Sequence, residues 1–295
     1  MPIDVRPRRS VLYMPGSNAR TLEKARALDA DGLIFDLEDA VAPDAKPAAR
    51  LAVVAAVSSD GYGRRELIVR VNGLGTKWGE DDLAAAARMP IDGVLLPKVE
   101  SVEMVRQAEA MLVAGGAGDG LAIWCMMETP RGILRAAEIA GASPRIAGLV
   151  MGTSDLANDL RTRPTSDRLP LWTSLGLCVL AARACDLAIL DGVHLDLADD
   201  EGFARSCRQG RELGFDGKTL IHPKTIAPAN AAFAPSAEEV AQAHRIIVAH
   251  EVAIKAGAGV ALLDGKLIEY LHVENARRLV ALAAAIAERS ASQLS

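Results

Sequence analysis

The sequence is poor in aromatic residues, has no excess of positive charge and contains no long apolar run. Aromatic residues make up 3% of its 295 residues, which leaves few rings on which nucleic-acid bases could stack. Its 33 basic and 38 acidic residues give a net charge of −5, so the bulk positive charge of nucleic-acid-binding proteins is missing. No apolar run reaches the roughly 20 residues of a membrane span. We therefore expect a protein that binds neither nucleic acid nor membrane.

Cysteine is also scarce. The four cysteines, Cys125, Cys178, Cys185 and Cys207, form no CxxC pair and have no zinc-finger spacing. Three of them lie in apolar or helix-like stretches, so free thiols in a reducing compartment are the simplest interpretation. The basic N-terminal segment is not followed by the apolar core of a secretory signal. These absences predict a cytoplasmic protein.

A glycine-rich dinucleotide fingerprint is missing after the first apolar run, which argues against an open doubly wound sheet. Instead, short apolar runs recur about every 30 residues, the length of one strand and its crossover helix. The runs are 11–14, 33–37, 67–71, 94–96, 121–127, 146–151, 187–190 and 219–221. Helix-like stretches separate them, so they are typical of parallel strands covered on both faces. We predict a (β/α)8 TIM barrel over residues 1–232.

The last part of the chain, residues 233–295, does not repeat this pattern. Ser236 and Glu239 have the spacing of a capping box, and the helix that they begin should end at Gly257. A hairpin-like segment and a last helix follow. We predict a C-terminal helical extension that packs on a neighbouring subunit. Within the barrel, the polar segment 161–174 fills the longest interval between runs and is expected to form a substrate lid at the rim.

Ionisable residues follow most of the predicted strands, at the end where barrel enzymes carry their active sites. Glu128 and Asp155 end consecutive runs, so their carboxylates should converge. Two adjacent carboxylates raise each other's pKa unless a cation lies between them. Oxygen ligands without a nearby His or Cys suit Mg²⁺. The alternative is that both residues only cap the helices that follow.

A second acidic group, Asp36, Glu38 and Asp39, follows the second run. These residues either ligate the metal, hydrogen-bond its water molecules, or are solvated loop acids. Arg70 lies within an apolar strand and needs an anionic partner. That partner is either this acidic group or a carboxylate or thioester oxygen of a substrate. His222 is a candidate general base, and the alternative for it is a structural role.

Several motifs occur in a characteristic order: RSVLYMPGSN, LIFDLEDAVAPDAKPAAR, METPRG, MGTSDL and LGFDGKTLIHPKTI. Together they resemble the citrate lyase beta-subunit-like family of CoA-ester lyases. Relatives of that family include malyl-CoA and citramalyl-CoA lyases and, more distantly, the HpcH/HpaI aldolases. The resemblance covers nearly the whole chain. It implies a TIM barrel, Mg²⁺ held by Glu128 and Asp155, and Arg70 at the substrate.

The resemblance also implies where CoA is bound. The implied contacts lie near Tyr13, Lys24, Ser154, Ile221 and His222. In the family a basic residue usually follows the PGS turn, whereas this chain has Asn18 there. The family pattern therefore predicts one phosphate contact fewer.

A catalytic acid from a neighbouring subunit is a further implication of the resemblance. The family residue is typically Asp, and the matching position here is Glu269. The additional methylene shifts the carboxyl by about 1 Å, a distance that matters in catalysis. The resemblance suggests a homotrimer or hexamer, in which each site is completed by a second chain.

The activity expected first is a retro-Claisen cleavage of a malyl-, citramalyl- or citryl-type CoA thioester to acetyl-CoA and a 2-oxo acid. Mg²⁺ would chelate the carboxylate and hydroxyl oxygens, Arg70 would stabilise charge on the thioester oxygen, and Glu269 would protonate the enolate. Three alternatives remain. They are a malyl-CoA-type thioesterase, a citrate lyase beta subunit acting on a citryl group carried by an acyl carrier protein, and a non-catalytic barrel that binds CoA esters.

Overall fold

The computed structural model describes residues 5–292 of the chain. They divide into two compact units, Arg8–Phe233 and a second unit made of Met1–Pro7 and Ala234–Ser295. Residues 1–4 of the predicted barrel and residues 293–295 of the predicted extension lie outside the described residues.

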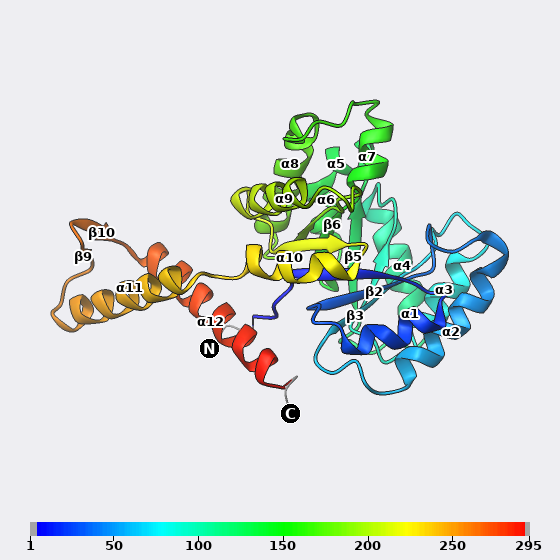
Figure 1. The fold of residues 1–295 in the computed structure, drawn as a ribbon, viewed down its shortest axis with the longest axis horizontal. Helices are drawn as coiled ribbons and strands as arrows, with labels where there is room; N and C mark the ends of the chain where they lie inside the picture. Colours follow the sequence, from blue (N-terminus) through cyan, green and yellow to red (C-terminus); the bar gives the residue numbers. More distant parts are fainter. Residues whose placement is uncertain (1–4, 293–295) are drawn as a thin grey trace. The chain divides into compact units, whose positions relative to one another are not determined.

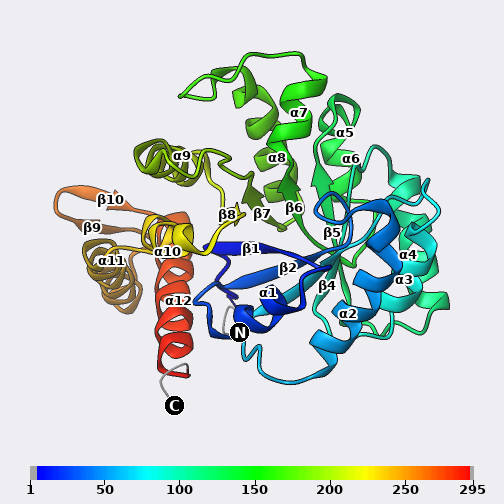
Figure 2. The same cartoon turned by 45° about the vertical axis from the view of Figure 1, so that its right-hand side comes forward.

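In the first unit, eight parallel strands close into a barrel in chain order, with β8 hydrogen-bonded to β1 (Figures 1 and 2). The strands are β1 Ser10–Pro15, β2 Gly32–Asp36, β3 Glu66–Arg70, β4 Gly93–Leu96, β5 Ala122–Met127, β6 Ile146–Met151, β7 Ala188–Asp191 and β8 Gly217–Leu220. The predicted TIM barrel is confirmed, and each predicted strand matches the observed one to within two residues at either end.

Helices connect the strands and surround the barrel (Figure 2). They are α1 Ala19–Lys24, α2 Lys46–Ser58, α3 Gly79–Ala86, α4 Val102–Ala114, α5 Pro130–Leu134, α6 Ala136–Ala140, α7 Thr153–Asp159, α8 Trp172–Ala184, α9 Asp200–Leu213 and α10 Ile226–Phe233, with short 3-10 turns η1 Ala25–Ala27, η2 Pro43–Ala45, η3 Leu169–Leu171 and η4 Pro223–Thr225. Side-chain oxygens of Ser101, Thr129 and Asp199 accept hydrogen bonds from the first turns of α4, α5 and α9. These caps fix where the helices begin.

Alternating side chains give the barrel two cores, one between the strands and the helices and one inside the barrel. Trp124 on β5 is fully buried in the inner core. A Cβ added at Gly93 or Gly148 on the adjacent strands would lie 3.0 or 2.3 Å from its indole ring. These two glycines therefore leave the space that the ring occupies.

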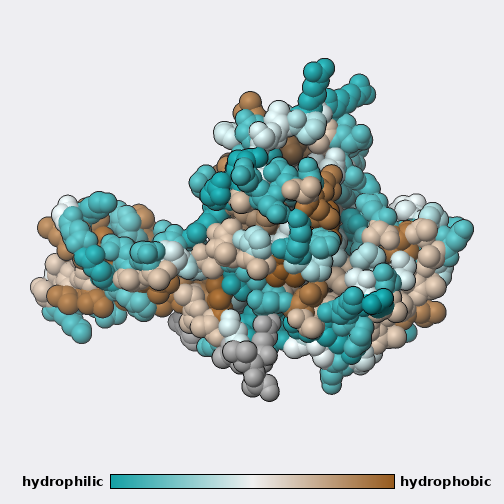
Figure 3. Space-filling model, viewed as in Figure 1, coloured by the Kyte–Doolittle hydropathy of each residue, from teal (hydrophilic) through white to brown (hydrophobic). Residues whose placement is uncertain are grey.

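The second unit contains α11 Ala237–Lys255, the hairpin β9 Ala261–Leu263 and β10 Lys266–Ile268, and α12 Tyr270–Ser292. The predicted capping box is confirmed, since the Glu239 N–H donates to Ser236 Oγ at 3.1 Å and the Ser236 N–H donates to Glu239 Oε2 at 2.7 Å. Two helices and a hairpin thus follow the barrel, and their packing on a neighbouring subunit stays a prediction. Exposed apolar side chains gather on this unit, at the left of Figure 3; they include Val248, Val252, Leu262, Leu267 and Leu271.

Across residues 5–292, no helix combines the length and the apolar character that a membrane crossing requires. The four cysteines are free thiols.

Candidate active site

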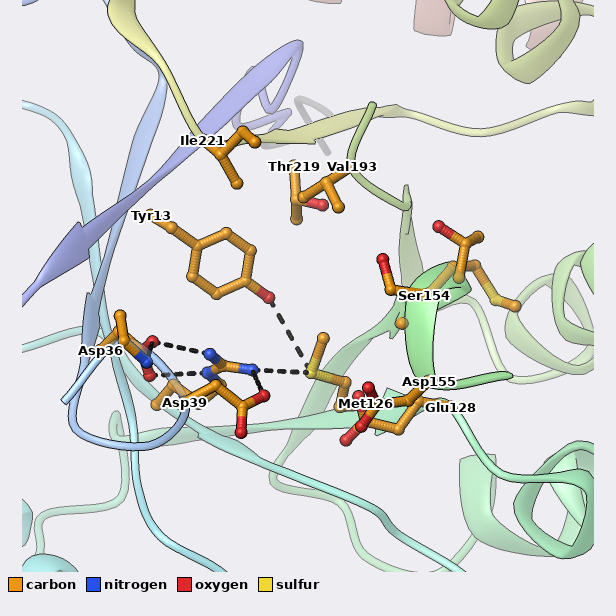
Figure 4. A pocket seen from close by; sticks show the side chains of 15 residues that line it. Tyr13, Asp36, Asp39, Met126, Glu128, Ser154, Asp155, Val193, Thr219 and Ile221 are labelled. Atoms are coloured by element: carbon orange, nitrogen blue, oxygen red, sulfur yellow. Dashed lines mark hydrogen bonds and ion pairs between the residues drawn. The ribbon is translucent and has the colours of Figure 1, made fainter. Parts of the chain in front are cut away.

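A cavity of about 320 Å³ opens at the carboxyl end of the barrel strands (Figure 4). It is lined by Tyr13, Asp36, Asp39, Ala40, Arg70, Met126, Glu128, Met151, Gly152, Thr153, Ser154, Asp155, Val193, Thr219 and Ile221. Nearly all of these residues lie at the ends of strands or directly after them, where barrel enzymes carry their chemistry. In Figure 4, Asp36 and Asp39 lie on one side of the cavity, and Glu128 and Asp155 lie on the other.

Arg70 and Asp36 form the fixed part of this cavity. The β2–β3 register places them side by side. Arg70 Nε donates to Asp36 Oδ1 at 2.7 Å, and Arg70 Nη2 donates to Asp36 Oδ2 at 2.6 Å. The backbone N–H groups of Glu38 and Ala40 donate to the same carboxylate at 2.9 and 3.0 Å. The carboxylate is thus saturated, and the guanidinium has a single orientation.

The remaining edge of Arg70 is directed at other cavity groups. Its Nη1 lies 2.9 Å from Glu38 Oε2 and 3.5 Å from Asp39 Oδ2, and its guanidinium lies 5.0 Å from the centre of the Tyr13 ring. Burial acts to lower the pKa of Arg70, but the hydrogen bonds and charge of Asp36 outweigh it and raise that pKa. Of the two partners considered for Arg70, the structure shows the acidic group, and Nη1 is the guanidinium nitrogen to which Asp36 is not hydrogen-bonded.

Glu128 follows β5 and is 2% exposed. Its Oε1 accepts a 2.8 Å hydrogen bond from the backbone N–H of Lys98. Its Oε2 lies above Gly152, where an added Cβ would come within 2.5 Å of that oxygen. Burial raises the pKa of Glu128 to about 7, and the negative charge of Glu38 acts in the same direction.

Asp155 lies in the first turn of α7, and its side chain is 40% exposed. Lys98 Nζ is 3.2 Å from Asp155 Oδ2 and 3.3 Å from Glu38 Oε1. From the sequence, no role is predicted for Lys98. The available signal was its place directly after the fourth strand, next to the strand end that carries Glu128.

The donor set fits Mg²⁺. Within residues 5–292, no three His, Cys, Asp or Glu side chains are grouped as a complete metal site. Two carboxylates, Glu128 and Asp155, line the cavity, and Mg²⁺ is commonly held by one or two carboxylates while water and substrate oxygens complete its octahedron. Gly152 leaves the space beside Glu128 Oε2 free of a side chain. The region is also short of positive charge, because five carboxylates, those of Asp36, Glu38, Asp39, Glu128 and Asp155, face the two cations Arg70 and Lys98.

The structure brings only some of the implied CoA contacts to the cavity. Tyr13, Ser154 and Ile221 line it. Lys24 lies exposed at the end of α1 and is not part of the lining. His222 is exposed as well, and its Nδ1 accepts the backbone N–H of Lys224 at 3.1 Å. A role for Lys24 or His222 therefore requires a ligand that extends beyond the cavity.

Two further predicted positions have local structural roles. The side chain of Asn18 accepts the Thr21 N–H at 3.1 Å and so caps α1. Glu269 belongs to the second unit, where it precedes α12 and its N–H donates to His272 Nδ1 at 3.0 Å.

A buried ionic group beside the cavity went unrecognised in the sequence. Asp191 and Lys218, at β7 and β8, are completely buried and form a 2.8 Å ion pair. Arg168, in the polar segment expected to be a lid, donates to both carboxylate oxygens of Asp191 at 2.8 and 2.9 Å. The middle of that segment is therefore anchored to the barrel. An arginine in a polar loop carries no sequence signal for such a distant partner.

Comparisons with known proteins agree with this fold. Residues 9–223 match the family model described as HpcH/HpaI aldolase/citrate lyase. The chain is 52% identical over 286 residues to a protein of Cereibacter sphaeroides named (3S)-malyl-CoA thioesterase, and the match covers 97% of this chain and 98% of the relative. It is 36% identical to the citrate lyase subunit beta of Escherichia coli, with 94% of both chains covered.

Among solved structures, the CitE protein of Mycobacterium tuberculosis was crystallised in complex with magnesium, acetoacetate and coenzyme A. It matches with a TM-score of 0.74 and 31% identity, covering 93% of this chain and 97% of that one.

Proposed function

This chain belongs to the HpcH/HpaI aldolase/citrate lyase family, and we propose that it hydrolyses the thioester bond of a malyl-CoA-type 3-hydroxyacyl-CoA with the help of Mg²⁺. The observation that carries the proposal is the 52% identity, over almost the whole chain, to proteins named (3S)-malyl-CoA thioesterase. From the sequence alone, carbon–carbon cleavage was expected first and hydrolysis was an alternative. We now place hydrolysis first.

The cavity supports this class of substrate. A volume of about 320 Å³ suits a short acyl group, so the rest of CoA would lie outside, over the rim. Glu128 and Asp155 would hold the metal ion, which supplies Lewis acidity to the oxygen atoms of the acyl group. Tyr13 and Ser154 would contact the part of the substrate that lies between the metal ion and Arg70.

Arg70 and a carboxylate that acts as a base would carry out the chemistry. Arg70 Nη1, whose position is fixed by Asp36, would stabilise the negative charge that develops on the thioester oxygen. A carboxylate base would take a proton from water, whose oxygen bonds to the thioester carbon. The C–S bond then breaks, the CoA sulfur leaves with the electron pair and acquires a proton, and the products are a hydroxy dicarboxylic acid and free CoA.

Glu269 of a second copy of the chain is the base that we propose. It lies on the unit that carries the exposed apolar side chains of α11 and the hairpin, and such exposed groups favour association with another subunit. We therefore also propose a homotrimer or hexamer in which the extension of one chain completes the site of another.

The second candidate is the lyase reaction. It is favoured by the 36% identity to citrate lyase beta subunits and by the CitE complex with magnesium, acetoacetate and coenzyme A. In that reaction the substrate hydroxyl loses its proton, the adjacent carbon–carbon bond breaks, and the resulting enolate of acetyl-CoA is protonated. A citryl group carried by an acyl carrier protein would be an alternative substrate for this lyase reaction.

Purified protein with Mg²⁺ and a panel of malyl-, citramalyl- and citryl-CoA separates these possibilities when free thiol and 2-oxo acid are assayed together. Hydrolysis gives thiol without oxo acid, in a reaction that EDTA abolishes. Oxo acid with acetyl-CoA would show the lyase and overturn the proposal. Neither product, with CoA esters still bound, would indicate the non-catalytic barrel.

A further inference from the structure

Lys98 contacts both carboxylates of the candidate metal site, Glu128 and Asp155, and also the nearby carboxylate of Glu38. Its backbone N–H holds Glu128 at 2.8 Å, and its Nζ lies 3.2 Å from Asp155 and 3.3 Å from Glu38. We infer that the ammonium group of Lys98 is an internal counter-ion, which holds Asp155 and Glu38 in the metal-free protein and is displaced when a divalent cation binds. This inference rests on the proposed metal site at Glu128 and Asp155.

The backbone of Lys98 is what gives this residue its two roles. Lys98 has φ +49°, in the left-handed region that only glycine adopts at little cost. In this conformation the N–H is directed at Glu128 and the side chain reaches the other two carboxylates. A non-glycine residue in this region is unusual and is often found at functional sites, and here the side chain supplies what glycine cannot, a positive charge.

Electrostatics explain why the ammonium and the metal would exchange. Arg70 forms ion pairs with Asp36, Glu38 and Asp39. The cation paired with Asp155 is Lys98. When a divalent cation binds the Asp155 carboxylate, an ammonium group about 3 Å from the same oxygen is strongly repelled. The Lys98 side chain is 48% exposed, so solvent is available to receive the displaced group.

Removing the ammonium should therefore favour the metal. We expect Lys98→Met to bind Mn²⁺ on the order of tenfold more tightly than wild type, the scale of two partly exposed ion pairs. Lys98→Gly is the companion variant, because glycine accepts the positive φ and keeps the N–H that holds Glu128. The matched control is Lys224→Met, which removes a lysine paired with the exposed Asp200 and should leave the affinity unchanged.

A second measurement follows the ammonium group itself. The chain has eight lysines, and brief labelling with acetic anhydride followed by mass spectrometry reports the reactivity of each amine. In wild type, saturating Mg²⁺ should increase the labelling of Lys98 several-fold and leave that of Lys224 constant. This readout separates displacement from a simple repulsion between a lysine and a metal that both stay in place.

The outcomes are distinct for the inference and for the metal site. Tighter Mn²⁺ binding by both Lys98 variants, together with Mg²⁺-dependent exposure of Lys98, supports the inference. Unchanged or weaker binding, or labelling that does not respond to Mg²⁺, overturns it while the metal site stands. Wild type that fails to bind Mn²⁺, or binds it no better than Glu128→Gln, overturns both.

Discussion

Arg70 and Asp36 are joined by two parallel hydrogen bonds, of 2.7 Å from Nε and 2.6 Å from Nη2. The β2–β3 register makes them direct neighbours on adjacent strands. Both side chains are buried, with 8% of the Arg70 side chain and 1% of the Asp36 side chain exposed to solvent. The pair therefore acts as one rigid element that presents Nη1 to the cavity, and the electrostatic part of the proposed mechanism depends on it.

Asp36→Asn should destabilise the protein strongly. It leaves a buried guanidinium with weaker partners, and breaking a buried ion pair in this way costs about 3–5 kcal/mol of unfolding free energy. Urea unfolding measures the loss.

Arg70→Lys keeps a charge but loses the two-point geometry, so kcat/KM should fall on the order of 100-fold. Arg70→Lys with wild-type kinetics would remove Arg70 from the mechanism.

Gly152→Ala should disrupt the metal site. The new Cβ would lie 2.4 Å from Glu128 Cβ and 2.5 Å from Glu128 Oε2, so the Glu128 side chain must move. We expect Mn²⁺ affinity, measured by the paramagnetic signal of free Mn²⁺, to fall by on the order of tenfold or more, because ligand geometry sets affinity.

Gly176→Ala is the matched control for that substitution. Its Cβ would meet nothing within 4 Å, and the residue lies inside α8. Replacing a helical glycine in this way should stabilise the protein by roughly 0.5–1 kcal/mol and leave Mn²⁺ binding unaltered. Equal Mn²⁺ affinities for the two variants would argue against Glu128 as a ligand.

Glu269→Ala and Glu128→Ala should each be inactive alone, and mixing them should restore part of the activity. In a mixed oligomer, some sites combine an intact Glu128 on one chain with an intact Glu269 on another. Activity is measured after the two proteins are unfolded and refolded together, and the separately refolded proteins serve as the control. No recovery, in mixtures shown by sedimentation to be oligomeric, would contradict a site shared between subunits.

The stability of the barrel should depend on pH through Asp191. Burial acts to raise the pKa of Asp191, but the charges of Lys218 and Arg168 outweigh it, and the pKa is lowered. Because the folded pKa lies below the unfolded value of about 4, the stabilisation is complete above that pH and is lost as the pH falls through the folded value. The urea concentration at the midpoint of wild-type unfolding should therefore decrease as the pH is lowered below about 4.

The double variant Asp191→Asn/Lys218→Met should show a smaller fall between pH 5 and pH 3, since the titrating pair is gone. At pH 7 it should also be more stable than Asp191→Asn alone, which leaves the buried Lys218 ammonium and the partly buried Arg168 guanidinium without their shared carboxylate. Asp264→Asn, at an exposed pair with Arg245, should keep the wild-type profile. An identical acid profile for the double variant and wild type would show that Asp191 does not control acid stability.

The fold and part of the site could be predicted from the sequence because they depend on local patterns. Repeated apolar runs locate the strands, and the ends of parallel strands in a barrel meet at one rim. This was enough to predict Asp36, Arg70, Glu128 and Asp155 as site residues, and the structure places all four at the cavity.

The other features depend on backbone conformation and on long-range contacts. The positive φ of Lys98 and its reach to Glu38 and Asp155 leave no periodic signal in the sequence. The contact of Arg168 with Asp191 joins a loop to a strand 23 residues away. Such pairings follow from how the chain closes in space, so no local pattern of residues reveals them.

The most direct test of hydrolysis is to supply (3S)-malyl-CoA with the protein and Mg²⁺ in water enriched in ¹⁸O, and to analyse the four-carbon product by mass spectrometry. We predict free CoA and malate that carries one ¹⁸O atom in the carboxylate formed from the thioester, with no product when EDTA is present or when Glu128 is replaced by Gln. Glyoxylate and acetyl-CoA in equal amounts, without labelled malate, would contradict it and assign the carbon–carbon lyase reaction instead.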